Sequence, residues 1–233
     1  LASTLSVQFG TRVTALAPAA SGIDVTIEGT GTSVETHDAV LVTAPAPQTA
    51  ALVSQLAPVD ALAGVDMAPC WSLMIALGTP SPVVTDTFQA TTGTIEPPLA
   101  WLARNSAKPA RPSTPECWVA QADAAYSDAR LEADPSEVAA ELAAEVLPCL
   151  ERAGADLTYC RAHRWRYALT RVPLEAPFFS CPGMPVWAAG DWCLGHRADH
   201  AYRSGRAVAL EIAAALGLAA APGASDTTAG SVA

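Results

Sequence analysis

The sequence predicts a mixed α/β (α+β) protein in which an α/β domain interleaves with a mainly antiparallel β-sheet domain. Two observations support this fold class. Residues 39–42 are apolar throughout, as in a buried parallel strand, and a short helical pattern follows at 48–56. The middle of the chain instead carries several strand-like runs and one long helical pattern. We therefore assign residues 1–65 and 184–219 to the first domain and residues 66–183 to the second.

The first domain is expected to contain a hairpin before its buried strand. Residues 5–16 alternate between apolar and polar, and residues 23–28 alternate again before a Gly-Thr-Gly turn, which predicts two paired strands. Pro45 then stops the apolar run. Near the other end of the chain, an apolar strand at 185–191 leads into an alanine-rich helix at 199–216.

The second domain is expected to form a sheet with one helix. The predicted strands are residues 70–78, 88–93, 99–106, 116–123 and 157–169. A helix is predicted at 135–152, because Asp134 is a suitable N-cap and a proline occupies the first helical position. Residues 170–183 read as an irregular segment. The Gly/Ser/Thr/Ala-rich tail at 220–233 is predicted to be disordered.

Composition excludes several classes of function. The chain has 233 residues, 51% of them hydrophobic and 15% charged, with a net charge of −10, so a nucleic-acid surface is not expected. Its six cysteines form no CxxC pair, which favours reduced thiols in a cytoplasmic protein. No apolar run is long enough to predict a membrane span. The first residue is not methionine, so the true start of the protein is expected to be missing.

Two apparent motifs fail on inspection. His196 and His200 are four residues apart, but Arg197 stands where a metalloprotease helix has its glutamate, and no third ligand follows, so no metal site is predicted. The glycines at 29 and 31 open a GxG pattern, but the third glycine of a dinucleotide fingerprint is absent, and the next segment is strand-like rather than helical. Residues 29–31 are therefore predicted to form a hairpin turn.

The pair Gly190-Asp191 is the most informative feature. It follows an apolar strand and precedes a helix, an arrangement that places a glycine, a carboxylate and free helix N–H groups together. The carboxylate can accept hydrogen bonds from ribose or ribityl hydroxyl groups. An ordinary strand-to-helix connection without a ligand explains the same pattern, and the residues alone leave both interpretations open.

The run from His163 to Tyr167 alternates along a predicted strand. His163, Trp165 and Tyr167 share one face, and Arg164 and Arg166 share the other. The aromatic face is either part of the core or the wall of a binding site, and the wall becomes the better interpretation only if a flat ligand binds nearby.

Taken together, these segments resemble the renalase-like, FAD-dependent members of the amine oxidase superfamily. The resemblance extends to about residue 218 and rests on LSVQFGTRVTAL, DAVLVTAPAPQTAALV, APCWSLMIALG, AWLARNSAKPAR, HRWRYAL and GDWCLGHRADHAYRSGRAVA. It implies two domains. One is a Rossmann-like domain of the NAD(P)-binding type, which holds FAD and is incomplete in this chain. The other is an antiparallel sheet that covers the flavin.

The resemblance also implies which residues contact the cofactor. They are Val13, Ala44, Pro45, Gly190, Asp191, Asp199, His200 and Ala201. The backbone of Val13 would contact the adenine. The pair Gly190-Asp191 would lie at the ribityl–pyrophosphate region. The helix beginning at Asp199 would point at the flavin pyrimidine, and the loop after Thr43 would pass near the cofactor.

The substrate residues follow from the same resemblance. Trp165 and Tyr167 would form walls of the substrate pocket, and Asn105 and Lys108 match the family's ARNSxKP stretch without a defined role. The implied reaction is hydride transfer from a reduced nicotinamide-type or amine substrate to the flavin, with O2 as the final acceptor. No catalytic residue is implied.

Three departures from the family pattern qualify this expectation. His196 and His200 stand where relatives usually carry glycines, and Tyr126-Ser127 replaces a tryptophan-serine pair. The strand–GxGxxG–helix unit that binds the pyrophosphate does not occur in the sequence. The chain is therefore expected to hold FAD weakly by itself. A subunit whose site is completed by a separately encoded N-terminal segment is one alternative to a complete enzyme. The other is a truncated, non-catalytic remnant or a partner-binding module without a cofactor.

Overall fold

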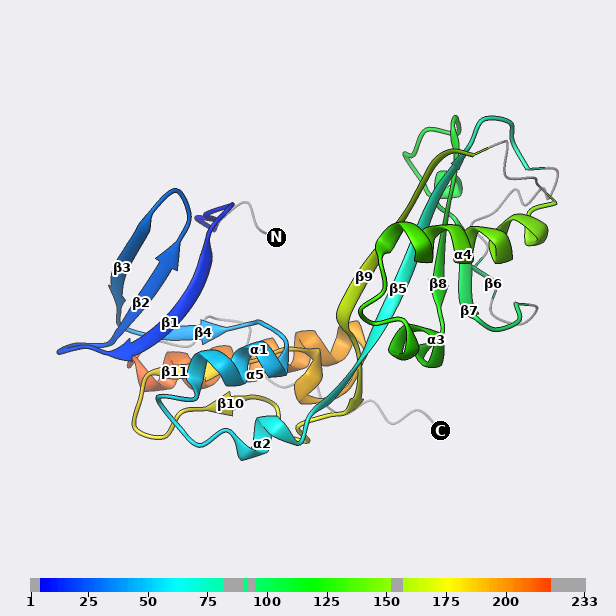
Figure 1. Ribbon diagram of the computed structural model, residues 1–233. Helices are drawn as coiled ribbons and strands as arrows, with labels where there is room; N and C mark the ends of the chain where they lie inside the picture. The colour runs from blue at the N-terminus through cyan, green and yellow to red at the C-terminus, as the bar shows by residue number, and fades with distance from the viewer. Residues whose placement is uncertain (1–4, 82–89, 92–94, 152–156, 219–233) are drawn as a thin grey trace. The chain divides into compact units, whose positions relative to one another are not determined.

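The computed structural model describes residues 5–81, 90–91, 95–151 and 157–218 (Figure 1). The predicted disordered tail at 220–233 lies outside these residues. The chain divides into two compact units, Leu1–Asp66 with Thr170–Ala233, and Met67–Leu169. The segment 170–183, assigned above to the sheet domain, therefore belongs to the first unit.

The first unit begins with a three-stranded antiparallel sheet in the order β1-β2-β3. Its strands are β1 (Arg12–Pro18), β2 (Ile23–Glu28) and β3 (Thr32–His37). Gly22 is required in the turn before β2, because its φ is +83° and a Cβ atom there would lie 2.1 Å from the carbonyl oxygen of His37. The hairpin turn expected at residues 29–31 is present, and the strand-like segment after it forms β3, which pairs with β2. Residues 5–11, expected to be part of a strand, are not one.

A second sheet of the first unit contains the predicted buried parallel strand. Its order is β10-β11-β4, and β4 pairs with β11 in parallel, with Val42 opposite Ala188. The strands are β4 (Val40–Val42), β10 (Phe179–Ser180) and β11 (Val186–Ala188). β10 lies in the segment that was expected to be irregular.

The helices of the first unit are α1 (Ala46–Val53), α2 (Asp60–Ala63) and α5 (Ala198–Ala215), and α5 packs on this second sheet. Val208 and Ile212 of α5 pack against Trp187 and Ala189, which fixes α5 on β11 and the residues that follow it. Because β4 and β11 are parallel, their carboxyl ends meet at one edge of the sheet.

The second unit is a five-stranded sheet in the order β6-β7-β8-β5-β9. Its strands are β5 (Asp66–Leu77), β6 (Ala90–Thr91), β7 (Leu99–Arg104), β8 (Glu116–Ala122) and β9 (Leu157–Val172). The pairs β6–β7, β7–β8 and β5–β8 are antiparallel, as predicted. The helix α4 (Pro135–Cys149) lies across one face of this sheet (Figure 1), and a short helix, α3 (Ala124–Ala129), precedes it.

One face of this sheet forms a core with α4. Val138, Leu142 and Val146 of the helix are fully buried against the apolar side chains of β5, β7 and β8, among which Trp71 and Leu73 are also fully buried. The helix presents these residues at i, i+4 and i+8, a spacing typical of one buried helical face. The opposite face of the sheet is not covered by α4.

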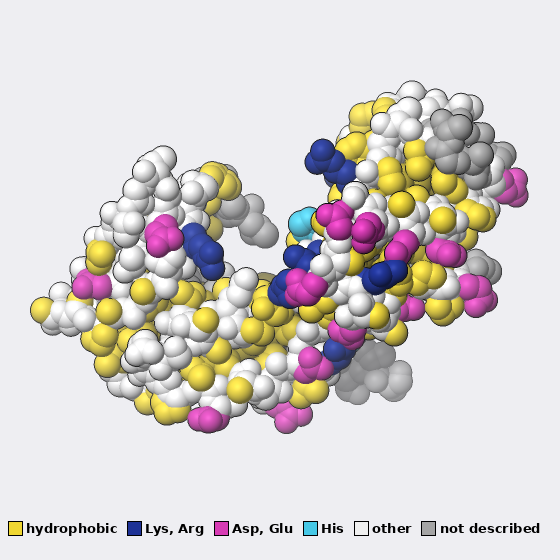
Figure 2. Space-filling model, in the orientation of Figure 1, with side chains coloured by type: hydrophobic (Ala, Val, Ile, Leu, Met, Phe, Trp, Pro, Cys, Tyr) yellow, Lys and Arg dark blue, Asp and Glu magenta, His cyan; other side chains and the backbone are white. Residues whose placement is uncertain are grey.

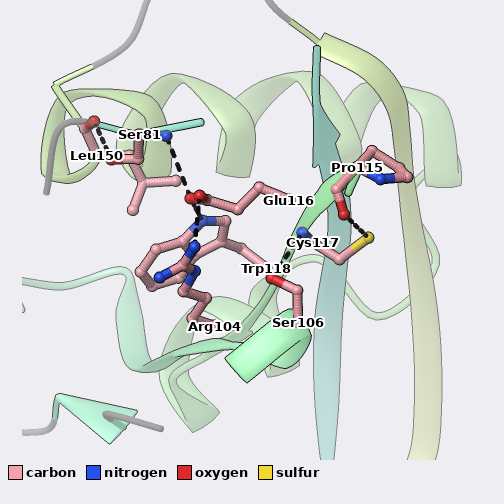
Figure 3. Close-up of polar contacts among 8 residues, drawn as sticks. All are labelled: Ser81, Arg104, Ser106, Pro115, Glu116, Cys117, Trp118 and Leu150. Carbon is pink, nitrogen blue, oxygen red and sulfur yellow. Dashed lines mark hydrogen bonds and ion pairs between the residues drawn. The ribbon is translucent and has the colours of Figure 1, made fainter. Parts of the chain in front are cut away.

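A buried carboxylate joins several segments at the edge of this core (Figure 3). Glu116 is 2% exposed, and its Oε1 accepts hydrogen bonds from Trp118 Nε1 at 2.6 Å and from the Ser81 N–H at 3.3 Å. Its Oε2 accepts from Arg104 Nη2 at 3.0 Å. Ser81 in turn donates through Oγ to the carbonyl of Leu150, 2.8 Å away. Glu116 therefore connects β8 with β7 and, through Ser81, with the end of α4.

The N-cap of α4 supports a prediction about pH. Asp134 accepts hydrogen bonds from the N–H and the hydroxyl of Ser136, and these bonds lower the pKa of Asp134. A carboxyl with a lowered pKa stabilises the fold at neutral pH and loses that contribution as the pH falls through its folded-state value. We expect Asp134→Ala to lower the Tm at pH 7, and Asp134→Asn, which keeps an acceptor, to lower it less. Thermal unfolding from pH 7 to about pH 3 measures this, and a difference between Asp134→Ala and wild type that stays constant with pH would contradict it.

Within the described residues, no helix combines the length and the hydropathy that crossing a membrane requires.

Candidate functional site

A hollow of about 320 Å³ opens at the carboxyl ends of β4 and β11, beside α5. Its lining residues are Leu41, Thr43, Ala189, Gly190, Asp191, Ala201 and Gly205. Three segments that are distant in the sequence therefore meet here. The carboxyl ends of parallel strands are the usual place for a nucleotide in open α/β sheets, where the backbone ends and a helix N-terminus converge. The structure thus brings Gly190, Asp191 and Ala201 together around one hollow.

Gly190 is held in place by contacts on both sides. Its N–H donates to Ser204 Oγ of α5 at 3.1 Å. A Cβ atom at this position would lie 2.5 Å from Nε1 of Trp192, so the buried indole leaves no room for a side chain. The backbone itself is extended, with φ 173°, and glycine is required by space alone.

Trp192 ties this turn to the end of β4. Its side chain is 1% exposed, and its Nε1–H donates to the carbonyl of Ala44 at 3.1 Å. Thr49 Oγ1 donates to the same carbonyl at 2.9 Å, while Pro45 caps the N-terminus of α1. The loop at Ala44 and Pro45 is therefore fixed under the hollow, although neither residue lines it.

Asp191 lines the hollow from a 3₁₀ turn at Asp191–Cys193. One oxygen, Oδ1, accepts a hydrogen bond from the Trp192 N–H at 2.9 Å, which orients the side chain. A carboxylate has acceptor capacity for several donors. Asp191 can therefore accept hydrogen bonds from ligand hydroxyl groups while the turn stays intact.

The first turn of α5 borders the hollow, but its three predicted residues differ in position. Ala201 lines the hollow. Asp199 pairs with Arg197, Oδ1 to Nε at 2.9 Å, and this hydrogen bond lowers the pKa of Asp199. His200 is not among the lining residues. If residue 195 had a Cβ atom, that atom would lie 2.6 Å from Nδ1 of His200. The φ of Gly195 is +139°, which also favours glycine.

Val13 lies apart from the hollow. It is in β1, opposite Ile27 of β2, and its side chain is 39% exposed. Its predicted backbone contact with adenine stays a prediction.

A second pocket, of about 360 Å³, lies on the second unit. It is lined by Cys70, Gln121, Trp165, Tyr167, Ala168 and Leu169. The structure thus brings Trp165 and Tyr167 together, and burial raises the pKa of the Cys70 thiol beside them. Asn105 and Lys108 are elsewhere, at a 3₁₀ turn (Asn105–Ala107) after β7, where the Lys108 N–H donates to the Asn105 carbonyl at 3.3 Å. Neither lines this pocket.

Several residues of the two sites were missed by the sequence analysis. Leu41 and Gly205 line the first hollow, Ser204 bonds to Gly190 beside it, and Cys70 and Gln121 line the second pocket. The spacing of Ala201, Ser204, Gly205 and Val208 indicates one face of a helix with small residues, and this signal was available in the sequence. That Cys70 and Gln121 line one pocket depends on the register of β5 and β8, in which Ser72 lies opposite Gln121, and alternation alone does not give the register.

Within the described residues, no group of three or more His, Cys, Asp or Glu side chains has an arrangement that could hold a metal ion.

The chain has a mixed α+β architecture with antiparallel sheets, few helices and a hollow at the ends of parallel strands. A solved structure with this fold comes from Exiguobacterium sp. 255-15 and is described as a "Putative protoporphyrinogen oxidase". It superposes with a TM-score of 0.60 at 14% sequence identity, over 87% of this chain and 46% of that protein. The present chain therefore spans less than half the length of that relative.

The family follows from the sequence match. Residues 1–213 match the family described as "Flavin containing amine oxidoreductase", which is most of the 233-residue chain. The chain belongs to this family. The cofactor of the family is FAD, and its members are oxidoreductases, in agreement with the resemblance drawn from the sequence.

Proposed function

We propose that this chain acts as an FAD-dependent oxidoreductase of the renalase-like group. The proposed reaction is hydride transfer from a reduced nicotinamide-type or amine substrate to the flavin, with O2 as the final acceptor. The observation that carries the proposal is the hollow in which Gly190 and Asp191 meet the first turns of α5 at the ends of two parallel strands. The family match supports FAD as the cofactor. The class of substrate and the use of O2 as the acceptor are proposed.

The residues around the hollow fit a large, flat cofactor. Ala189, Ala201 and Gly205 have little or no side chain, so a ligand can approach the backbone closely at these positions. A Cβ atom on Gly205 would meet no atom within 4 Å, so the space above this part of α5 is open. Asp191 supplies the acceptor that ribityl or ribose hydroxyls need.

In this proposal the residues of the chain bind the cofactor and orient the substrate. FAD, when bound, would be the electron acceptor. The Asp191 carboxylate accepts hydrogen bonds from hydroxyl groups, and the N-terminal end of α5 places its positive dipole toward electron-rich atoms. Trp165 and Tyr167 orient a flat substrate. A substrate that is already a reduced ring requires no general base, so the proposal assigns none.

The pyrophosphate requires a further element. The strand–GxGxxG–helix unit that binds it in related folds does not occur among the 233 residues. In the proposal a segment outside these residues binds it. The second candidate function is a module that keeps the fold and binds a partner without FAD.

Flavin reduction distinguishes the two candidates. The chain would be prepared with a strand–GxGxxG–helix segment of a renalase-like relative, loaded with FAD and freed of excess cofactor. We expect stoichiometric flavin, bleached anaerobically by isomeric dihydronicotinamides or by simple amines. Protoporphyrinogen, from the name given to the solved relative, is the third substrate to assay. A preparation that keeps FAD but is reduced by none of these would overturn the proposed activity, and one that never keeps FAD would favour the partner-binding module.

We expect Asp191→Ala to weaken FAD retention in this preparation by about 1–3 kcal/mol, the range for losing a hydrogen bond to a charged group. Asp191→Asn should weaken it less, because the amide oxygen can still accept from the Trp192 N–H. Fluorescence titration of the apoprotein with FAD gives the two Kd values. Thermal unfolding of the apoproteins is the control, since a large loss of stability would mean that the substitution disturbs the turn. Equal FAD affinity in Asp191→Ala and wild type would contradict the assigned role.

A further inference from the structure

Ser204 is a polar residue on the buried face of α5. It is 0% exposed, as is Val208 one turn further along, and these two are the buried residues of this helix. A buried hydroxyl group costs free energy unless it is hydrogen-bonded, and alanine forms helices better than serine does. Neither helix formation nor apolar packing therefore explains a serine at this position. Its hydrogen bonds have to explain it.

The first hydrogen bond of Ser204 lies where β11 leaves the sheet. The Ala189 N–H still donates to the carbonyl of Val42 at 3.0 Å, in continuation of the parallel ladder between β11 and β4. The next N–H, that of Gly190, donates instead to Ser204 Oγ at 3.1 Å. Ser204 therefore takes over from the sheet at the first residue of the connection to α5.

A second contact joins Ser204 to the far end of the same turn. Burial raises the pKa of the Cys193 thiol, and a hydrogen bond with the Ser204 hydroxyl acts in the opposite direction. Cys193 is fully buried, and its N–H donates to the carbonyl of Gly190 at 3.2 Å. One hydroxyl group on α5 thus contacts both Gly190 and Cys193, which enclose Asp191 and Trp192 in the chain.

Asp191 lies between these two contacts, and the turn holds it. The N–H groups of Leu194 and Gly195 donate to its carbonyl at 2.9 and 2.7 Å. The Trp192 N–H donates to Oδ1 of its carboxylate at 2.9 Å. The main chain and one carboxylate oxygen of Asp191 are therefore bonded within the turn. Any shift of the turn relative to α5 moves the carboxylate with it.

The hollow beside the turn depends on this placement, because its wall offers few other polar groups. The lining residues, all in the described part of the chain, include one charged side chain, Asp191, and one hydroxyl group, that of Thr43. The face drawn in Figure 2 likewise shows mainly hydrophobic and uncharged side chains over the first unit. Ala201 and Gly205 also line the hollow, and they precede Ser204 by three residues and follow it by one. Ser204 therefore fixes the carboxylate relative to the helix surface that borders the hollow.

We propose that Ser204 is a positioning residue for cofactor binding. Through Gly190 and Cys193 it holds Asp191 where the carboxylate accepts hydrogen bonds from hydroxyl groups of the ligand. Ser204 is not among the lining residues, and in this proposal it does not touch the ligand. The inference rests on the proposed function and adds a residue to the same site. It predicts that Ser204 contributes to FAD affinity through Asp191, in addition to its contribution to stability.

Ser127 offers a matched control in the other unit. It is also 0% exposed, and its Oγ accepts a hydrogen bond from the Trp71 N–H at 3.1 Å, the same distance as between Ser204 and Gly190. Both serines thus accept a backbone N–H in a fully buried place. Ser127→Ala and Ser204→Ala are therefore expected to lower stability in urea denaturation by similar amounts, so a difference between them at the hollow reports on position rather than on stability.

Hydrogen exchange of the chain without flavin tests whether Ser204 holds the turn. Amide exchange is followed residue by residue by NMR, and the amides to compare are Trp192, Leu194 and Gly195, whose bonds to Asp191 do not involve Ser204. In Ser204→Ala we expect these amides to exchange about tenfold faster, or more, than the loss of global stability accounts for. In Ser127→Ala they should change only by the global effect. Unchanged protection of the three amides in Ser204→Ala would overturn the proposal.

Ser204→Cys separates the hydroxyl group from the volume of the side chain. A thiol is close to a hydroxyl group in size but is a weak acceptor. We expect Ser204→Cys to show the same fast exchange as Ser204→Ala. Wild-type protection in Ser204→Cys would mean that side-chain volume holds the turn, and the hydrogen bond from Gly190 would lose its assigned role.

A double-mutant cycle tests whether the same contact serves cofactor binding. In the flavin-loaded preparation described above, the Kd for FAD is measured for Ser204→Ala, for Asp191→Ala and for the double variant. We expect Ser204→Ala to raise the Kd about fivefold or more when Asp191 is present, and less than about twofold when residue 191 is alanine. Ser127→Ala should leave the Kd unchanged. Equal factors in the two backgrounds would rule out an action through Asp191.

The two experiments separate this inference from the proposed function. If the preparation never keeps FAD, the proposed function and the role of Ser204 in cofactor binding both fail, while the exchange rates still decide whether Ser204 holds Asp191. If FAD is kept and Ser204→Ala binds it as tightly as the wild type, the proposed function stands and the role of Ser204 fails.

Discussion

Replacing Glu116 with alanine is expected to lower the free energy of unfolding by about 3 kcal/mol or more, because breaking a buried ion pair typically costs 3–5 kcal/mol. The carboxylate is 2% exposed and accepts from three donors, the side chains of Trp118 and Arg104 and the N–H of Ser81 (Figure 3). Its removal takes away the acceptor for Trp118 Nε1 in a place that water does not reach easily. Urea denaturation followed by tryptophan fluorescence measures the change.

Two further variants show which property of Glu116 matters. Glu116→Gln keeps an acceptor but loses the negative charge, and we expect about 1–3 kcal/mol of destabilisation. Glu145→Ala is the matched control, since Glu145 is exposed on α4, and it should change stability by no more than about 0.5 kcal/mol. An effect of Glu116→Ala as small as that of the control would mean that water replaces the carboxylate, and that the network does not fix the edge of the core.

The elements that could be predicted are those with a strong apolar pattern or a cap. The helix α4 was expected at 135–152 and occurs at Pro135–Cys149, because Asp134, Pro135 and its buried apolar face act together. β4 was recognised as a parallel strand from its continuous apolar run. The helix α3 was missed, and β3 was recognised only as a strand-like segment after a turn, without bounds. The side chains of both are mostly polar or small, and tertiary packing rather than local pattern determines them.

The candidate site could be predicted only in part, for a similar reason. Gly190 and Asp191 are visible as a glycine and an acid at the end of an apolar strand. Their partner Ser204 lies 14 residues further on, and it was found only when α5 was seen to pack on β11. The loop at Ala44 is fixed by Trp192, 148 residues away, through one hydrogen bond. Contacts between residues so far apart in the sequence depend on the whole fold. Sequence patterns therefore identify residues that could contact a ligand, but not the residues that hold them in place.

The second large effect is expected at Gly190. Gly190→Ala should lower the free energy of unfolding by about 3 kcal/mol, at the upper end of the usual cost of overpacking. The new Cβ would lie 2.5 Å from Nε1 and 2.7 Å from Cδ1 of Trp192. The indole cannot swing away cheaply, because it is 1% exposed and its N–H is bonded to the carbonyl of Ala44. Since φ is 173° and suits any residue, the whole effect arises from this collision.

Gly205→Ala separates folding from cofactor binding. Gly205 lines the same hollow, but a Cβ there meets no atom within 4 Å, and alanine is a better helix former by about 1 kcal/mol. We therefore expect Gly205→Ala to keep or raise stability in urea denaturation while Gly190→Ala lowers it. If FAD occupies the hollow, the added methyl of Gly205→Ala should still weaken FAD retention in the flavin-loaded preparation. If Gly190→Ala unfolded at the same urea concentration as the wild type, Trp192 would have to move at little cost. The turn would then tolerate a side chain at residue 190, contrary to this prediction.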